Sequence, residues 1–120
     1  MIDSSILLSI KDMIGLNAEQ TNFDNTIIIH INKVFKDLNQ LGVGPEEGFK
    51  IIDDYTRWED YISDTEKFND VITYMYLKVK LLFDPPLSST VIASMERMIS
   101  ECEWRLNVEA ESTKVDEEEE

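Results

Sequence analysis

The sequence predicts an all-α fold, a four-helix bundle-like domain with helix hairpins. Apolar residues recur at three- and four-residue steps in four segments, which is the spacing of one helix face. Glycines or a pair of prolines follow three of these segments and act as stops. The chain has 120 residues, of which 42% are hydrophobic, and this suits one globular domain with a modest core.

The first two predicted helices span about residues 3–14 and 22–41, and Gly15 and Gly42 end them. The run Ile27–Ile29 is β-branched and locally favours a strand. The helical spacing of apolar residues continues on both sides of this run. We therefore expect a helix throughout the second segment.

A short irregular or extended insert is expected after the second helix. Three glycines and Pro45 in the stretch GVGPEEGFKIIDDYTRW mark turns. Residues 49–53 favour a short strand or extended piece, and residues 58–62 indicate a short helix. We interpret the aromatic residues of the insert as a small core at one end of the helices. The alternative is an interface cluster, because Trp and Tyr are favoured interface anchors.

The third and fourth helices are predicted to form an antiparallel hairpin. The third spans about residues 64–83, because the stretch YMYLKVKLLF continues an apolar stripe that is too long for an ordinary strand. Pro85 and Pro86 forbid its continuation, and the fourth helix restarts near Ser88 or Ser89. The connection is only a few residues long, which predicts antiparallel neighbours.

A disordered acidic tail is expected after the fourth helix. The composition changes after Val108 to EAESTKVDEEEE, which has almost no apolar content. A segment of this kind cannot bury enough apolar surface to offset the entropy of ordering. We therefore divide the chain into a helical domain, residues 1–108, and a flexible acidic tail, residues 109–120.

The net charge of −14 limits the classes of partner. The last twelve residues hold seven acids and one lysine, but the rest of the chain also carries 18 acids against 10 bases. This balance argues against a broad grip on nucleic-acid phosphates or on an anionic membrane surface. It is compatible with a small acidic regulator, or a DNA-mimic inhibitor, that binds a basic nucleic-acid protein.

No catalytic, cofactor-binding or metal site is predicted. We interpret His30 as a structural residue of the second helix and Cys102 as a core residue of the fourth. One histidine and one cysteine cannot form a zinc site of normal spacing. A single cysteine fits a reducing compartment. The sequence shows no signal peptide and no apolar run of about 20 residues, so we expect a soluble intracellular protein without a membrane partner.

Four stretches together resemble small head–tail connector proteins of long-tailed bacteriophages. They are HINKVFKDLNQLGVGPEEGF from His30, TRWEDYI from Thr56, YLKVKLLFDPP from Tyr76 and ECEWRLN from Glu101. The resemblance covers about residues 1–110, and its most specific parts are LNQLGVG and YLKVKLLFDPP followed by WRLN. It implies a mostly α-helical adaptor, not an enzyme, that assembles as a ring of about twelve copies beneath the portal protein.

The resemblance also implies that the ring extends the DNA channel and provides a docking surface for the next head-completion or tail protein. The protein would be made in the host cytoplasm and lie in the virion, and its C-terminal region would contact the portal. We expect DNA to pass without tight binding, because acids that face the channel repel phosphates. A ring of identical copies needs two different contact surfaces on each copy. The candidates for subunit or portal contact are Phe49, Ile51, Tyr55, Trp58, Tyr61, Leu82, Phe83, Trp104 and Arg105.

Overall fold

The protein is all-α, as the sequence predicts. The computed structural model describes the backbone of residues 5–62 and 65–118, and the side chains of residues 5–62 and 69–111. The described residues form helices and turns, and their one β-bridge is an isolated pair, Ser5 with Arg57. The helices are α1 (Ile6–Met13), α2 (Asp24–Gln40), α3 (Trp58–Tyr61), α4 (Thr65–Phe83) and α5 (Ser89–Glu118).

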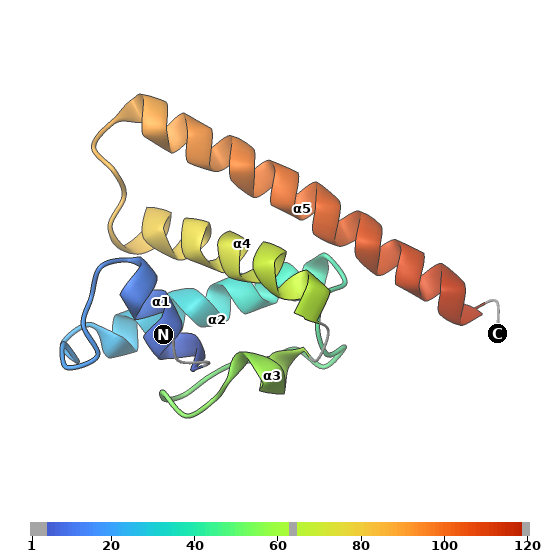
Figure 1. Cartoon of the computed structure of the whole chain (residues 1–120), viewed down its shortest axis with the longest axis horizontal. Helices are drawn as coiled ribbons and strands as arrows, with labels where there is room; N and C mark the ends of the chain where they lie inside the picture. Colours follow the sequence, from blue (N-terminus) through green and yellow to red (C-terminus); the bar gives the residue numbers. More distant parts are fainter. Residues whose placement is uncertain (1–4, 63–64, 119–120) are drawn as a thin grey trace.

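Three long helices determine the architecture. α2, α4 and α5 run in alternating directions, and α4 lies between the other two and packs on both (Figure 1). α1 packs on α2 and α4. The predicted hairpin is confirmed, because α4 ends at Phe83 and α5 returns along it from Ser89. Ser88 caps the return, since its Oγ accepts a hydrogen bond from the Val91 N–H at 3.3 Å.

The core lies where these helices meet. The β-branched run of α2 belongs to it, because Ile27 and Ile31 point inwards one turn apart while Ile29 is exposed. Burial on this face outweighs the local strand preference of the run. Further fully buried side chains are Ile6, Ile10, Val34, Leu38, Val71, Tyr74, Met75, Val79 and Leu106.

A buried ion pair joins the start of α2 to α1. Lys11 is 1% exposed, and its Nζ lies 2.8 Å from Oδ1 of Asp24. The same amino group donates a hydrogen bond to the Ala18 carbonyl at 3.3 Å. A buried lysine needs such partners, because desolvating an unpaired charge is very costly.

The insert between α2 and α3 contains no strand. Residues 49–53 are irregular, so the expected short strand is absent and the extended alternative holds. Hydrogen bonds from side chains attach the insert to the helices, in place of the backbone hydrogen bonds of a β-sheet. Asn32 of α2 donates to the Ile51 carbonyl at 3.0 Å and accepts from the Ile51 N–H at 2.8 Å. Ser5 donates to the Asp54 carbonyl at 2.7 Å.

The end of α5 differs from the sequence prediction. α5 continues without a break past Val108 to Glu118, where we expected a disordered tail. The segment after Val108 contains Ala and Glu, which are strong helix formers, and it contains neither Gly nor Pro. A helix that already exists extends at little cost. The prediction weighed apolar content and overlooked this propensity. The division into residues 1–108 and 109–120 stays a prediction.

Candidate interaction surfaces

The aromatic insert forms a small core with α2. The rings of Phe35, Phe49 and Tyr61 pack against one another with centroids 4.7–5.0 Å apart. Trp58 and Ile51 are also buried. Burial raises the pKa of the Tyr61 hydroxyl above its ordinary value. Four of the predicted interface residues, Phe49, Ile51, Trp58 and Tyr61, therefore contact the chain's own core.

The other side of the insert faces solvent. Tyr55 is 82% exposed and Ile52 is 78% exposed. Tyr55 thus remains available to a partner, as the sequence suggested. Ile52 was missed, because Ile51 and Ile52 are adjacent and the sequence does not say which of them points inwards.

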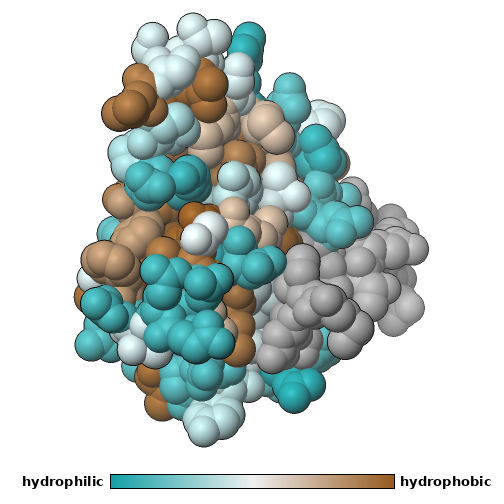
Figure 2. Space-filling model, turned by 60° about the vertical axis from the view of Figure 1, so that its left-hand side comes forward, coloured by the Kyte–Doolittle hydropathy of each residue, from teal (hydrophilic) through white to brown (hydrophobic). Residues whose placement is uncertain are grey.

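Apolar side chains gather at the end of the molecule where α4 turns into α5. In Figure 1 these two helices diverge towards the connection between them. We define the hairpin-end patch as Phe23, Leu82, Leu87 and Val91, all of which are exposed, Leu87 completely. The ring of Phe83 packs on Phe23 with centroids 5.4 Å apart. Figure 2, in which this end comes forward, shows apolar side chains among hydrophilic ones.

Leu82 and Phe83 were predicted as contact residues, and the structure places both at this end. Leu82 belongs to the patch itself. Phe83 is half-buried and contacts the patch through the ring of Phe23. Leu87 was missed by the sequence analysis. It follows the two prolines directly, and an apolar residue in so short a connection is the signal that could have identified it.

The outer face of α5 carries the other two predicted residues. Trp104 is 70% exposed and lines a shallow hollow with Ser100, Glu101 and Arg105. Arg105 pairs with Asp70 of α4 at 2.8 Å, so its guanidinium is partly engaged within the chain. An exposed tryptophan is a common anchor of protein interfaces.

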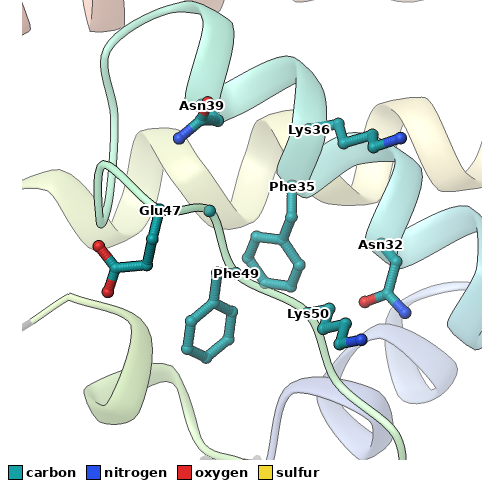
Figure 3. Close-up of a pocket in the computed structure, with 8 residues that line it drawn as sticks. Asn32, Phe35, Lys36, Asn39, Glu47, Phe49 and Lys50 are labelled. Carbon is teal, nitrogen blue, oxygen red and sulfur yellow. The ribbon is translucent and has the colours of Figure 1, made fainter.

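A pocket of about 510 Å³ lies between α2 and the insert. Phe35 and Phe49 form its floor, and Lys36 and Lys50 lie on one side of it with Asn32 between them (Figure 3). Glu47 lies on the opposite side. Both lysines are exposed, and neither has an ion-pair partner among the described residues. The sequence analysis missed these lysines, because they lie fourteen positions apart in the chain.

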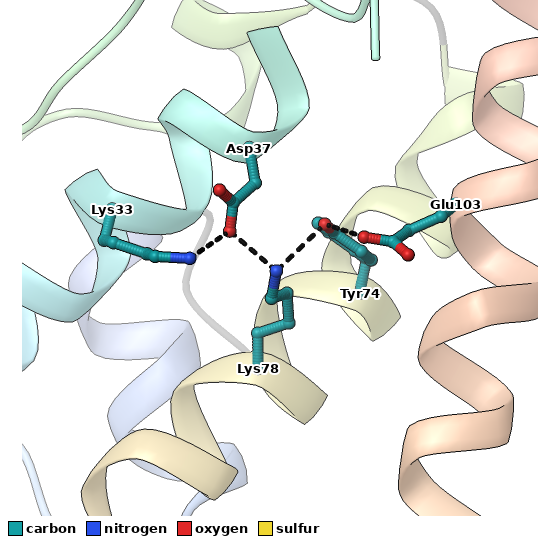
Figure 4. A network of polar contacts seen from close by, with 5 residues as sticks. All are labelled: Lys33, Asp37, Tyr74, Lys78 and Glu103. Carbon is teal, nitrogen blue, oxygen red and sulfur yellow. Dashed lines mark hydrogen bonds and ion pairs between the residues drawn. The ribbon is translucent and has the colours of Figure 1, made fainter. Parts of the chain in front are cut away.

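A polar network joins the three long helices (Figure 4). Asp37 of α2 accepts hydrogen bonds from Lys33 at 2.8 Å and from Lys78 of α4 at 2.6 Å. Lys78 also donates to the Tyr74 hydroxyl at 3.2 Å, and that hydroxyl donates to Glu103 of α5 at 2.8 Å. The five residues thus form one chain of contacts from α2 to α5.

The network determines two pKa shifts. Burial by itself raises the pKa of Asp37, but the hydrogen bonds and charges of Lys33 and Lys78 outweigh it and lower that pKa below its ordinary value. Burial, assisted by the hydrogen bond to Glu103, raises the pKa of Tyr74 above its ordinary value. The hydroxyl of Tyr74 therefore stays protonated and acts as a structural donor to Glu103.

The chain contains a single cysteine. Cys102 is buried in the core, as predicted, and burial is the first cause that raises the pKa of its thiol, with Asp70 adding to it and Arg105 opposing it. No group of three or more potential metal-ligating side chains occurs in the described part of the chain. None of its helices is long and apolar enough to cross a bilayer.

A family model described as "Phage connector protein" matches residues 6–113. This match spans α1 through most of α5. The chain belongs to this family. No curated protein and no solved structure matches the chain.

Membership in this family indicates the kind of role and the kind of partners that this connector protein has. The family is structural and not enzymatic, and it implies contact with phage portal or tail proteins and a place in the virion. The resemblance seen in the sequence is thereby confirmed at the level of the family.

Proposed function

We propose that this connector protein is an adaptor that assembles as a ring beneath the portal, extends the DNA channel and offers a docking surface to the next head-completion or tail protein. Family membership supports the connector role. The ring and the portal contact are our own extension of it. We place assembly in the host cytoplasm, where the protein is made, and its final position at the head–tail interface.

One observation carries the ring proposal: the two ends of the long helices differ. The hairpin-end patch is apolar, whereas the opposite end is where the acidic end of α5 projects (Figure 1). Identical subunits close a ring through two different surfaces, the front of one copy against the back of the next. A molecule with unlike ends and an uncovered apolar patch suits such head-to-tail contacts.

The exposed ring of Trp104 is our candidate for the portal contact, and Tyr55 for the contact with a later protein. Both are large aromatic side chains that bury little within their own chain. The excess of acids suits a channel wall that DNA slides past, because like charges keep the phosphates from binding tightly. We prefer this function to a DNA-mimic inhibitor, because the family match supports a connector.

The proposal is tested by the mass of the full-length protein, alone and mixed with its portal. Native mass spectrometry should show a closed ring, if not alone then on the portal. Val91→Asp places a charge in the hairpin-end patch and should weaken assembly by at least about tenfold. Ala93→Asp is the matched control, since Ala93 is exposed on the same helix and points about 200° away from Val91.

A monomer that shows no affinity for the portal would contradict the adaptor function. A ring that tolerates Val91→Asp as well as Ala93→Asp would leave the adaptor function in place and remove the hairpin-end patch from its interface. Circular dichroism of both variants should match that of the wild type, because both positions are exposed.

A further inference from the structure

The pocket between α2 and the insert is a cationic site in an acidic protein. The chain holds 25 acids and 11 bases, so most basic side chains have acids at hand. Lys11, Lys33, Lys78, Lys80 and Arg105 are all in ion pairs. Lys36 and Lys50, which share one pocket, have no ion-pair partner among the described residues, and the same holds for Arg57 and Arg97 elsewhere. Two unpaired lysines over an aromatic floor form a surface that fits an acidic, helical or extended segment.

The acidic end of α5, which we define as residues 111–118, has the complementary chemistry. It holds Glu111, Asp116, Glu117 and Glu118 against one basic residue, Lys114. The last turn of α5 contains no basic residue. Carboxylates at the C-terminus of a helix are unfavourable, because they lie at the negative end of the helix dipole. This end of α5 would therefore gain stability from cations supplied by another molecule.

The geometry of α5 directs its acidic end away from its own body. Near this end, Asn107 donates to the Leu41 carbonyl at 3.2 Å, and Ala110 lies against Gly42. Beyond them the helix projects past the other elements (Figure 1). Eight further residues at 1.5 Å each carry it about 12 Å outwards. A helix that projects in this way presents its last turns to a neighbouring molecule.

We propose that the acidic end of α5 of one copy docks on the Lys36–Lys50 pocket of a second copy. The contact is head-to-tail, because it joins two different surfaces of the same chain. It rests on the self-assembly proposed above and names one of the interfaces within it. The contact is mainly electrostatic, so salt should weaken it.

Cysteine cross-linking tests this pairing. It leaves both lysines of the pocket and the acids of the α5 end in place. The background is Cys102→Ala, which removes the single native thiol. Copies with Glu47→Cys at the pocket are mixed with differently tagged copies that carry Thr113→Cys in α5, then assembled, with the portal if it is required, and treated with a short bis-maleimide. We expect a cross-link between the two tags. Ala93→Cys in place of Glu47→Cys is the control and should give none.

The outcomes separate this inference from the adaptor function. A ring of full mass without the 47–113 cross-link overturns the docking and leaves the ring intact. In a separate sample, one chain carries both Glu47→Cys and Thr113→Cys. A cross-link within the monomer of that chain also overturns the docking, because α5 would then fold back on its own pocket. Absence of any assembly, on the portal as well, overturns both proposals together.

A charge exchange provides the second measurement. The pair K36E and K50E should weaken assembly by at least about tenfold, and adding E117K and E118K to the same chain should restore it. Both lysines are exposed and unpaired, so the fold should tolerate their replacement. Weakened assembly that the tail lysines do not restore would show that the pocket binds something other than α5, such as the portal, and would contradict the inference.

Discussion

Gly44 determines how closely the insert approaches Tyr61. Its φ of +84° lies in the left-handed region that favours glycine. A Cβ at this position would lie 2.6 Å from the Tyr61 ring, which is closer than atoms can pack. Two independent constraints, backbone conformation and space, thus require glycine here. The sequence marked a turn at this position but could not show the ring packed over it.

The two constraints can be separated by substitution. Gly44→Ala should lower the free energy of unfolding by about 2–4 kcal/mol, since it adds a clash to the backbone strain. Gly48→Ala is the matched control, because Gly48 has a φ of +93° and open space around its Cβ position. It should cost only about 1–2 kcal/mol. Urea unfolding of both variants measures the difference, and equal losses would contradict the contact with Tyr61.

At the level of elements, one side chain of α2 binds both backbone groups of a residue in the insert. Asn32 pairs with both backbone groups of Ile51, so it replaces the ladder that a strand would have used. This explains why the predicted strand is absent although the segment is ordered against the core. A carboxamide carries N–H donors and a carbonyl acceptor side by side, so it can bind the C=O and the N–H of one residue at the same time.

Loss of that amide should loosen the insert before it unfolds the protein. Asn32→Ala leaves the N–H and carbonyl of the buried Ile51 without their partner, which costs about 1–3 kcal/mol. We expect faster amide hydrogen exchange over residues 49–55 than over α4. Asn25→Ala is the control, because Asn25 is exposed on the same helix and its side chain has no hydrogen bond to the described residues. Unchanged exchange in the insert of Asn32→Ala would refute its role.

The whole molecule depends on a network that no single helix contains. Asp37, Lys78, Tyr74 and Glu103 connect α2, α4 and α5 through hydrogen bonds (Figure 4). Asp37 is the most informative member, because its pKa is lowered in the folded protein. Its contribution to stability is therefore complete above the pKa of an unfolded aspartate, about 3.9, and is lost as the pH falls through the lower folded value.

The lowered pKa of Asp37 predicts how the stability of the variant Asp37→Asn depends on pH. At pH 7 the variant should unfold with about 1–3 kcal/mol less free energy than the wild type, because it loses two charge-assisted hydrogen bonds. The difference in unfolding free energy should shrink below about pH 4, because the carboxylate of the wild type is protonated first in the unfolded state and then, at lower pH, in the folded state. Thermal unfolding across this range measures it. Asp12→Asn, at an exposed position, is the control and should match the stability of the wild type at pH 7. A constant gap for Asp37→Asn down to the lowest pH would contradict the assigned shift.

The sequence by itself determined the class of fold, the positions of the long helices and the family. Each of these depends on local signals: the three- and four-residue spacing of apolar residues, the glycine and Pro-Pro stops, and stretches such as YLKVKLLFDPP. It also placed Cys102 correctly in the core, because the helical phase of its stripe was clear.

Only the tertiary structure decided which side chains are free for partners. Ile51, Trp58 and Tyr61 became core, whereas Leu87, Ile52 and the Lys36–Lys50 pocket became surface. The physical reason is that exposure and ion pairing depend on contacts between residues far apart in the chain. The local spacing of apolar residues carries no information about such contacts. The same holds for the end of α5: composition predicted a loose tail, but a helix already packed on the core carries it on to Glu118.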